Sequence, residues 1–394
     1  MMSQISQVSY VHTAKYTTSS AELLADLVLG CNPFGLSKAY FINSGSEAMD
    51  AAMKMARQYH YERGDLQRKC WVSRRQAYHG NTIGAMSVSS NLPRLGPYKN
   101  AMLLPDVSFV SAPYAYRGQR ESESEEDYAT RLVEEVDLEF QKVGPENVIA
   151  FIGETMGGAT AACIVAPKGY FEGIRELCTK YGILLILDEV MCGSGRTGSY
   201  FAFEQEANAI PDIVTVGKGL GGGYAPIAGI YIHDRIIEAL RQGTGAYNHG
   251  HTYQAHPVSC AAALATQRII RRDNLVSQCA AKGEILKCFL ERQLSHKTYI
   301  GDIRGRGLFW GLEFVQDKAS KKPFNPSVQF GNRVAEACHQ RGLDVYPGQG
   351  TVDGLVGDHV ILAPPLIITN EEIETMVGIL VDAYCSVEAE MDGV

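Results

Sequence analysis

The stretch Ile213-Val-Thr-Val-Gly217-Lys218-Gly219-Leu-Gly221-Gly222-Gly223 places a lysine directly behind a short apolar run and among glycines. A run with this composition is typical of a strand buried on both faces of a parallel sheet. The glycines leave Lys218 room to reach a carbonyl carbon, and a lysine in such a setting can act as a covalent nucleophile. Lys218 is therefore the first candidate for a catalytic residue.

Two other interpretations of this stretch are weaker. Gly217, Gly219 and Gly222 match the G-x-G-x-x-G pattern of nicotinamide dehydrogenases, but there a helix follows the glycines directly. Here residues 225–232 predict another strand. A phosphate-binding P-loop needs Ser or Thr after its lysine, and Gly219 stands there instead.

Further apolar runs precede this strand, at 148–152 and 183–187, and residues 168–181 between them have helical spacing. The alternation predicts βα units and a mostly parallel central sheet flanked by helices, the α/β class. The three strands are followed by Glu154, Asp188 and Lys218. Because ligands of such sheets bind beyond the carboxyl ends of the strands, we expect these side chains to meet in one cleft.

Asp188 and Glu189 form a pair of adjacent carboxylates at the end of an apolar strand, which is costly unless positive charge meets them. A pyridinium N–H is one partner of this kind, because an ionised Asp188 would keep such a ring protonated and able to accept electrons. A metal ion is the other. No further ligand follows at metal-binding spacing, so no metal is expected.

Two stretches nearer the start offer further ligand contacts. Ser44 and Glu47 have the spacing of a capping box, and a helix beginning at Gly45 and Ser46 would present free N–H groups to a phosphate. In Ala77-Tyr78-His79-Gly80, the tyrosine could stack on a planar ring. A simple helix cap and a buried tyrosine beside a hydrogen-bonded histidine are the ordinary alternatives.

Composition excludes several classes of protein. The 394-residue chain is 45% hydrophobic and 20% charged, with a net charge of −8, which disfavours nucleic acid and anionic membranes as partners. The 10 cysteines are scattered without metal spacing, as in the reduced thiols of a cytoplasmic protein. The start has no secretory signal pattern, and no apolar run is long enough to span a membrane.

The remaining chain predicts a second, smaller domain. Residues 121–127 are acidic and predict an exposed loop entering a helix. Residues 256–294 predict one long connecting helix, followed by strands at 302–315 and 360–368 and a final helix at 371–388. We therefore expect an N-terminal segment, 1–20, a large cofactor-binding domain, 21–294, and a small α+β domain, 295–394.

Seven blocks of this sequence, in this order, resemble the class III pyridoxal-phosphate (PLP) aminotransferases of fold type I, and the resemblance runs from about Glu22 to Thr369. The blocks are FINSGSEAMDAAMKMAR, AYHGNTIGAMS, LDEVMCGSGRTG, VGKGLGGGYAPIAG, HTYQAHPVSCAAALA, RGRGLFWGLE and LAPPLIIT. The resemblance implies pyridoxal 5′-phosphate as cofactor and a homodimer with shared active sites.

The resemblance also implies a role for each matching residue. Lys218 would carry the cofactor as a Schiff base and shuttle the proton, and Asp188 would pair with the ring nitrogen. The other implied cofactor contacts are Gly45 and Ser46 at the phosphate, Thr252 from the neighbouring subunit, Tyr78 and Val190 on the two ring faces, and His79 and Glu154 nearby.

Two features depart from the family pattern. The family usually has several tens of residues before the segment that starts here at Gln7, so we expect a shortened or trimmed start. Many members hold the substrate carboxylate with an arginine in an Arg-Pro pair, where this chain has Tyr346-Pro347. The substrate contacts considered are therefore Tyr346 at that position and Arg117 as a replacement.

The resulting prediction is an aminotransferase that moves an amino group from an amine or amino acid donor to an oxo acid acceptor by a ping-pong mechanism. The missing arginine favours an amine or ω-amino compound as one partner. A racemase or aminomutase of the same fold, or a non-catalytic cofactor-binding protein, are the alternatives. The sequence leaves the donor, the acceptor, the stereochemistry and the pathway open.

Overall fold

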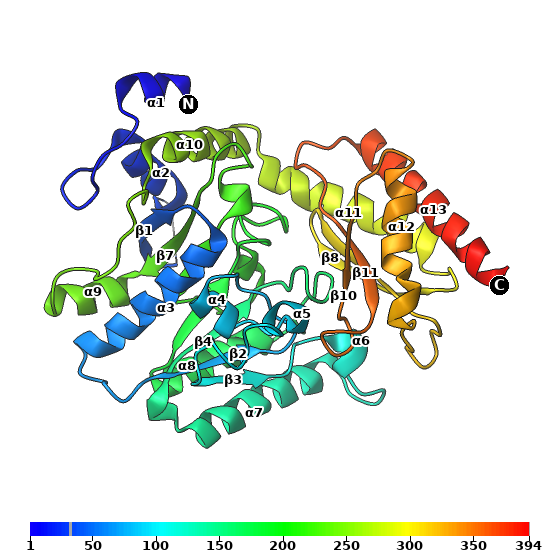
Figure 1. The fold of residues 1–394 in the computed structure, drawn as a ribbon, viewed down its shortest axis with the longest axis horizontal. Coiled ribbons are helices and arrows are strands. Elements are labelled where there is room, and N and C mark those ends of the chain that lie inside the picture. The colour runs from blue at the N-terminus through cyan, green and yellow to red at the C-terminus, as the bar shows by residue number, and fades with distance from the viewer. Residues whose placement is uncertain (31–33, 394) are drawn as a thin grey trace.

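A computed structural model describes residues 1–30 and 34–393, and it contains two separate sheets (Figure 1). A seven-stranded sheet has the order β1-β7-β6-β5-β4-β2-β3, and a four-stranded sheet has the order β10-β11-β9-β8. We call the parts built on them the large lobe and the small lobe. The predicted α/β class with a smaller α+β part is confirmed, whereas the domain boundaries after residues 20 and 294 stay a prediction.

The large sheet is parallel from β6 to β3, and β7 runs antiparallel to both of its neighbours, β6 and β1. Its strands are β1 (Leu36–Ile42), β2 (Cys70–Arg74), β3 (Val107–Val110), β4 (Val148–Glu154), β5 (Leu184–Asp188), β6 (Ile213–Val216) and β7 (Ala228–His233). The three strands predicted around Glu154, Asp188 and Lys218 are β4, β5 and β6, and the strand expected after the glycines is β7. All residues of β4, β5 and β6 are buried, which explains their unbroken apolar composition.

Helices cover both faces of the large sheet, and neighbouring residues of one strand pack on opposite sides. Leu185 and Leu187 join one core cluster, whereas Leu184 and Ile186 join the other. The first cluster includes residues of α2 (Ser19–Leu29), α7 (Glu125–Val143), α8 (Tyr170–Tyr181) and α10 (Pro257–Arg272). The second includes residues of α3 (Gly45–Glu62), α4 (Ile83–Ser87) and α9 (Asp234–Gln242).

The small lobe packs its sheet against three helices, and α11 leads into it from α10 (Figure 1). Its elements are α11 (Leu275–Leu294), β8 (Ile300–Arg306), β9 (Phe309–Phe314), α12 (Phe330–His339), β10 (Tyr346–Gln349), β11 (Asp358–Leu362) and α13 (Asn370–Asp392). Every strand pair in this sheet is antiparallel.

Three predicted elements differ from the structure. The connector at 256–294 is two helices, because Asn274 adopts a left-handed backbone conformation (φ 50°) between α10 and α11. The strand at 302–315 is a hairpin of β8 and β9, which turns at Gly307 (φ 55°). The strand predicted at 360–368 ends at Leu362, and two prolines, which have no backbone N–H to donate, follow shortly after.

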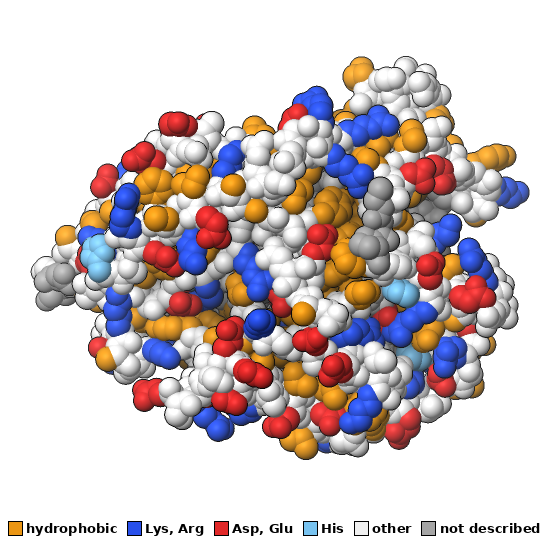
Figure 2. Space-filling view, turned by 180° about the vertical axis from the view of Figure 1, so that it is seen from behind, with side chains coloured by type: hydrophobic (Ala, Val, Ile, Leu, Met, Phe, Trp, Pro, Cys, Tyr) orange, Lys and Arg blue, Asp and Glu red, His pale blue; other side chains and the backbone are white. Residues whose placement is uncertain are grey.

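The remaining elements are short. They are α1 (Met2–Gln7), α5 (Leu92–Leu95), α6 (Ala115–Gly118), and the 3₁₀ turns η1 (Pro145–Asn147), η2 (Ala202–Gln205), η3 (Lys218–Leu220) and η4 (Pro326–Val328). None of the helices in the described part of the chain is long and apolar enough to cross a bilayer. On the face opposite to that in Figure 1, acidic and basic side chains of the described residues are interspersed rather than gathered by sign (Figure 2).

Candidate active site

A cavity of about 490 Å³ opens where β4, β5 and β6 end. This volume lies within the range of pockets that enclose a cofactor-sized molecule. Its lining comes from segments far apart in the sequence: Asn43, Ser44, Gly45, Ser46, Tyr78, His79, Gly80, Glu154, Met156, Asp188, Val190, Met191, Lys218, Gly223, Ala225, Pro226 and Ile227. The structure therefore brings Glu154, Asp188 and Lys218 to one cavity, as the strand order predicted.

Lys218 stands directly after β6 in a strained backbone conformation, with φ of 34°. Such a conformation costs a residue with a side chain about 1–2 kcal/mol and is typical of functional sites. Gly217 and Gly219 leave little space beside it, because an added Cβ would lie 3.2 Å from Val190 Cγ1 and 3.1 Å from Ser194 Cβ respectively. Within the described chain, the Lys218 ammonium makes no hydrogen bond or ion pair, so it is free to react.

The Asp188 carboxylate is buried at the cavity wall and held by two donors. His79 Nδ1 lies 2.8 Å from Asp188 Oδ2, and the Val190 backbone N–H donates to Oδ1 over 3.0 Å. An ionised Asp188 requires the His79 proton on Nδ1, which leaves Nε2 of the same ring buried and without a partner among the described residues. Both donors stabilise the ionised form of Asp188 and fix its orientation.

Glu154 is the second buried carboxyl group of the cavity. It accepts hydrogen bonds from the backbone N–H groups of Gly158, over 3.0 Å, and Tyr78, over 3.4 Å. Burial raises the pKa of Glu154, and the nearby Asp188 carboxylate adds to this, whereas His79 opposes it. Glu154 therefore lies in a setting that favours its neutral form.

Glu189, the other carboxylate of the predicted pair, faces away from the cavity. Its oxygens accept hydrogen bonds from the Thr155 hydroxyl and from the backbone N–H groups of Ala202 and Phe203, over 2.9, 2.8 and 2.8 Å. Glu189 is thus a structural residue of the turn after β5. Among the described residues, no group of three or more His, Cys, Asp or Glu side chains is arranged to hold a metal ion.

The other end of the cavity is formed by the start of α3. The predicted capping box is present, because Ser44 Oγ accepts from the Glu47 N–H over 3.3 Å and Glu47 Oε2 accepts from the Ser44 N–H over 3.1 Å. A side chain at position 45 would clash, since an added Cβ would lie 2.8 Å from Val190 Cγ1. Gly45 and Ser46 therefore present open backbone and the positive end of a helix dipole, which suits an anionic group.

Tyr78 lines the cavity at its mouth, where it meets an arginine that the sequence did not single out. The Arg94 guanidinium lies 5.0 Å from the centroid of the Tyr78 ring, and Arg94 Nη1 lies 3.4 Å from the Tyr78 hydroxyl. Burial raises the pKa of Tyr78, Arg94 opposes this, and the phenol of Tyr346 adds to it. Tyr346, at the start of β10, is thus near Tyr78 but does not line the cavity, and its role as a substrate contact stays a prediction.

The structure places Arg117 and Thr252 outside this cavity. Arg117 Nε donates to Glu313 Oε1 over 2.6 Å, and Arg117 Nη1 donates to the Lys321 carbonyl over 2.9 Å, so its charge is already paired. This geometry does not support Arg117 as a carboxylate clamp. Thr252 lies in the loop between α9 and α10 and is exposed in the single chain.

Several lining residues were not predicted. Met156 and Met191 follow β4 and β5 within a few residues, so the same strand-end argument that selected Glu154 and Asp188 could have found them. Asn43 precedes the predicted helix cap. The 225–227 segment carries no comparable signal in the sequence, because only the tertiary structure brings it to the cavity. Arg94 does not line the cavity, and it reaches Tyr78 only through the tertiary structure.

Comparisons with known proteins agree with this geometry. The sequence profile "Aminotransferase class-III" matches residues 1–384. An aminotransferase of Gibberella zeae is 45% identical over 96% of this chain and 74% of its own length, and an aminotransferase of Schizosaccharomyces pombe is 43% identical over 99% and 85%.

Solved structures give the same result. The ω-transaminase of Pseudomonas jessenii, in complex with PMP, superimposes with a TM-score of 0.91 at 33% identity, covering 98% of this chain and 83% of that one. These relatives favour amino-group transfer over the racemase, aminomutase and non-catalytic alternatives. The chain belongs to the class III aminotransferases and is an aminotransferase.

Proposed function

We propose that this aminotransferase binds pyridoxal 5′-phosphate in the cavity between β4, β5, β6 and α3, with Lys218 as the covalent attachment point. Class III aminotransferases use this cofactor. The observation that carries the proposal is the meeting of three features in one cavity: an unpaired lysine, a doubly hydrogen-bonded carboxylate and an open helix N-terminus. Bound there, the cofactor supplies an aldehyde that accepts the amino group and a ring that stores the electrons of the cleaved C–H bond.

Each residue has a distinct task in this proposal. The N–H groups at Gly45 and Ser46 bind the phosphate. Asp188 would pair with the ring nitrogen, because His79 Nδ1 and the Val190 N–H hold its carboxylate in a fixed orientation. Tyr78 and the Val190 side chain flank the ring, because both line the cavity.

The proton transfers fall to Lys218. Once the incoming donor has displaced its amine, Lys218 Nζ removes a proton from the donor carbon and returns a proton elsewhere in the same half-reaction. The lack of another partner among the described residues leaves Nζ available for both steps. An oxo acid then enters the same cavity and Lys218 acts in reverse, which gives ping-pong kinetics.

We further propose a homodimer in which Thr252 of one subunit completes the phosphate site of the other. Its exposed position on the loop before α10 is consistent with this role. The described cysteines are all free, which fits the reducing environment of the cytoplasm.

The donor that we propose is an amine or an ω-amino compound. Among the residues that line the cavity, Met156, Met191 and Ile227 provide an apolar wall, and Lys218 is the single Lys or Arg. Such a wall suits a donor whose reacting carbon bears an apolar group. Activity confined to ordinary α-amino acids would contradict this choice.

Reduction with borohydride tests the cofactor proposal. The purified holoenzyme is reduced and digested, and the modified peptide is identified by mass. We expect the label on Lys218 alone. In Lys218→Ala, both the label and the amino-transfer activity should be lost. Lys99→Ala, which changes an exposed lysine outside the cavity, is the matched control and keeps both. A label on another lysine would refute the assignment.

A further inference from the structure

We propose that Arg94 is the residue that binds the carboxylate of the oxo acid acceptor, at the mouth of the cavity beside Tyr78 and Tyr346. This inference rests on the proposed function, because it concerns the same cavity and the second half of the same reaction. It assigns a substrate-binding role to α5, a short helix that carries none of the cofactor contacts.

The charges that line the cavity require an additional cation. Glu154 and Asp188 are the carboxyl groups of the wall, and Lys218 is its single Lys or Arg. Lys218 is also the residue that reacts, so it cannot remain a fixed partner for a substrate carboxylate. The carboxylate of an acceptor would therefore find no free cation on the wall, and a guanidinium beside the cavity would complement it.

Arg94 is a suitable cation because its charge is not neutralised by an acid. Its Nη1 contacts two neutral oxygens at long distances, the Tyr78 hydroxyl at 3.4 Å and Asn81 Oδ1 at 3.5 Å. Within residues 1–30 and 34–393, no Asp or Glu forms an ion pair with it. Arg117, in contrast, is paired with Glu313. A free planar guanidinium can bind a carboxylate through two parallel hydrogen bonds.

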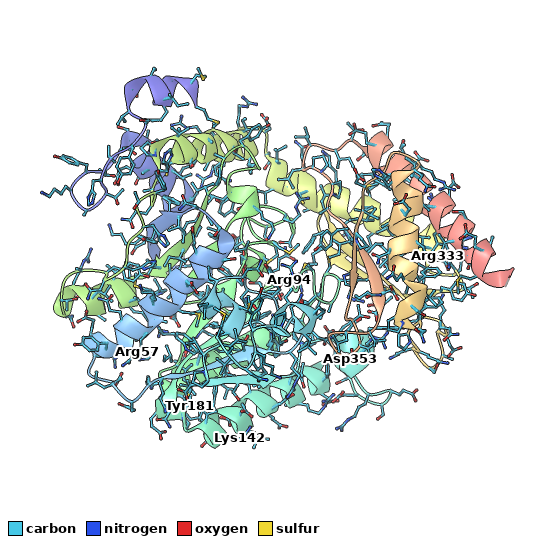
Figure 3. All side chains as sticks on the ribbon, in the orientation of Figure 1. Arg57, Arg94, Lys142, Tyr181, Arg333 and Asp353 are labelled. Atoms are coloured by element: carbon cyan, nitrogen blue, oxygen red, sulfur yellow. The ribbon has the colours of Figure 1, made fainter. Side chains whose placement is uncertain are left out.

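Contacts from both lobes hold α5, the helix that carries this arginine, beside the cavity. Arg94 stacks on Tyr78 of the large lobe, and its helix neighbour Leu92 approaches the small-lobe loop 350–357, where a Cβ added to Gly354 would lie 3.2 Å from Leu92 Cδ1. The same loop accepts hydrogen bonds from Gln76 Nε2 at the Gly350 and Thr351 carbonyls, each over 2.9 Å. Figure 3 labels Arg94 near the centre of the view, where the two lobes meet.

Arg94 approaches the cavity on its Tyr78 side, and its second contact, Asn81, connects it to the phosphate end, because the Asn81 N–H donates to Ser46 Oγ over 3.0 Å. The phosphate contacts that we propose come from the start of α3, whereas Arg94 covers the ring of Tyr78 and shares that neighbour with Tyr346 of β10. A carboxylate bound between Arg94 and Tyr346 would therefore lie beside Tyr78, on the side of the cavity that faces the small lobe.

Acceptor specificity of the holoenzyme tests this proposal. The second half-reaction is followed with pyruvate and with methyl pyruvate, which lacks the negative charge, and the ratio of their kcat/KM values is measured. If pyruvate is not an acceptor, 2-oxoglutarate and its dimethyl ester replace this pair. We expect Arg94→Met to lower the acid-to-ester ratio of kcat/KM by about 10- to 100-fold, because a charge-assisted hydrogen bond to the acid is lost. Arg94→Lys should recover part of the ratio, because it keeps the charge without the planar fork.

Lys99→Met is the matched control, since it removes an exposed positive charge from the same segment without touching Tyr78, and it should leave the ratio at the wild-type value. An unchanged ratio in Arg94→Met would overturn the proposal. An equal loss for acid and ester, or a loss of bound cofactor in place of a changed ratio, would also overturn it. If the wild-type protein transfers no amino group to either acid, the proposed function fails instead, whatever Arg94 does.

Discussion

Asp188 depends on its neighbours for the charge that the proposed chemistry requires. It is 5% exposed, and one of its two hydrogen-bond donors is the His79 ring. His79→Phe would remove that donor while filling the space. Because an unsatisfied buried carboxylate costs about 1–3 kcal/mol, we expect kcat/KM to fall roughly 10- to 100-fold.

The absorption spectrum of the bound cofactor separates this positioning role from a general loss of structure. In His79→Phe, Asp188 loses one of the donors that orient it toward the cofactor nitrogen. We therefore expect a shift in the pH at which the absorption spectrum of the bound cofactor changes. His79→Gln, whose amide can still donate to Asp188, should restore part of the wild-type behaviour. Equal defects in the two variants, with an unchanged spectral titration, would argue against this role.

Glu189 gives a prediction about pH and stability. Burial raises its pKa to about 7, against hydrogen bonds from Phe203, Ala202 and Thr155 that lower it. Because the pKa of Glu189 is higher in the folded protein than its ordinary value of 4.5, its contribution to the unfolding free energy is greatest below pH 4.5. That contribution is lost as the pH rises toward 7. Glu189→Gln removes this titration. The unfolding free energy of the variant minus that of the wild type should therefore be larger at pH 8 than at pH 5, by at most about 3 kcal/mol.

Urea unfolding of the cofactor-free proteins at the two pH values measures this difference. Glu126→Gln, on the exposed side of α7, provides the control and should show no comparable change. A difference that is constant with pH would mean that Glu189 stays ionised at pH 5 in the folded protein, held by its three donors.

At the scale of elements, the start of α3 links stability to ligand binding. Glu47 Oε2 accepts from the backbone N–H groups of Asn43 and Ser44, over 3.0 and 3.1 Å, and so fixes the segment that lines the phosphate end. Glu47→Ala should lower the unfolding free energy by about 1 kcal/mol and weaken cofactor affinity. Glu47→Gln, which can still accept one of the bonds, should have a smaller effect on both quantities. Thermal unfolding measures the stability and cofactor titration measures the affinity. An unchanged affinity in Glu47→Ala would mean that the helix cap does not contribute to phosphate binding.

The elements around this site were predictable to different degrees. The strands β4, β5 and β6 were found because burial on both faces makes them apolar throughout, and α3 was found from its capping box and alanine face. The break between α10 and α11 was missed, because Asn274 is compatible with a helix and adopts its left-handed conformation only in the folded chain. Arg94 was missed for a similar reason, since its contact with Tyr78 depends on how a short helix packs.

For the whole molecule, a buried ion-pair cluster joins the two lobes. Glu313 of β9 accepts from Arg117 of α6 over 2.6 Å and pairs with Arg304 of β8 at 2.9 Å. Arg304 also donates to the Ala161 carbonyl of the large lobe over 2.6 Å, and Lys321 donates to the Tyr116 carbonyl over 2.6 Å. The charge that the sequence offered for substrate binding at Arg117 is therefore used to hold the lobes together.

This cluster predicts a large effect from a single neutral substitution. Glu313→Gln would take the shared carboxylate from two buried guanidinium groups, of which Arg304 keeps its pair with Asp302 and Arg117 keeps none. Removing one partner of a buried pair costs about 3–5 kcal/mol. We expect that loss in urea unfolding, and a partial recovery in Glu313→Gln with Arg117→Met, because the second change removes the stranded charge. Glu390→Gln breaks an exposed pair with Arg333 and should cost less than about 1 kcal/mol. If Glu313→Gln is no more destabilising than this control, the two lobes are held together by their apolar contacts. The ion pairs between the lobes then contribute little to stability.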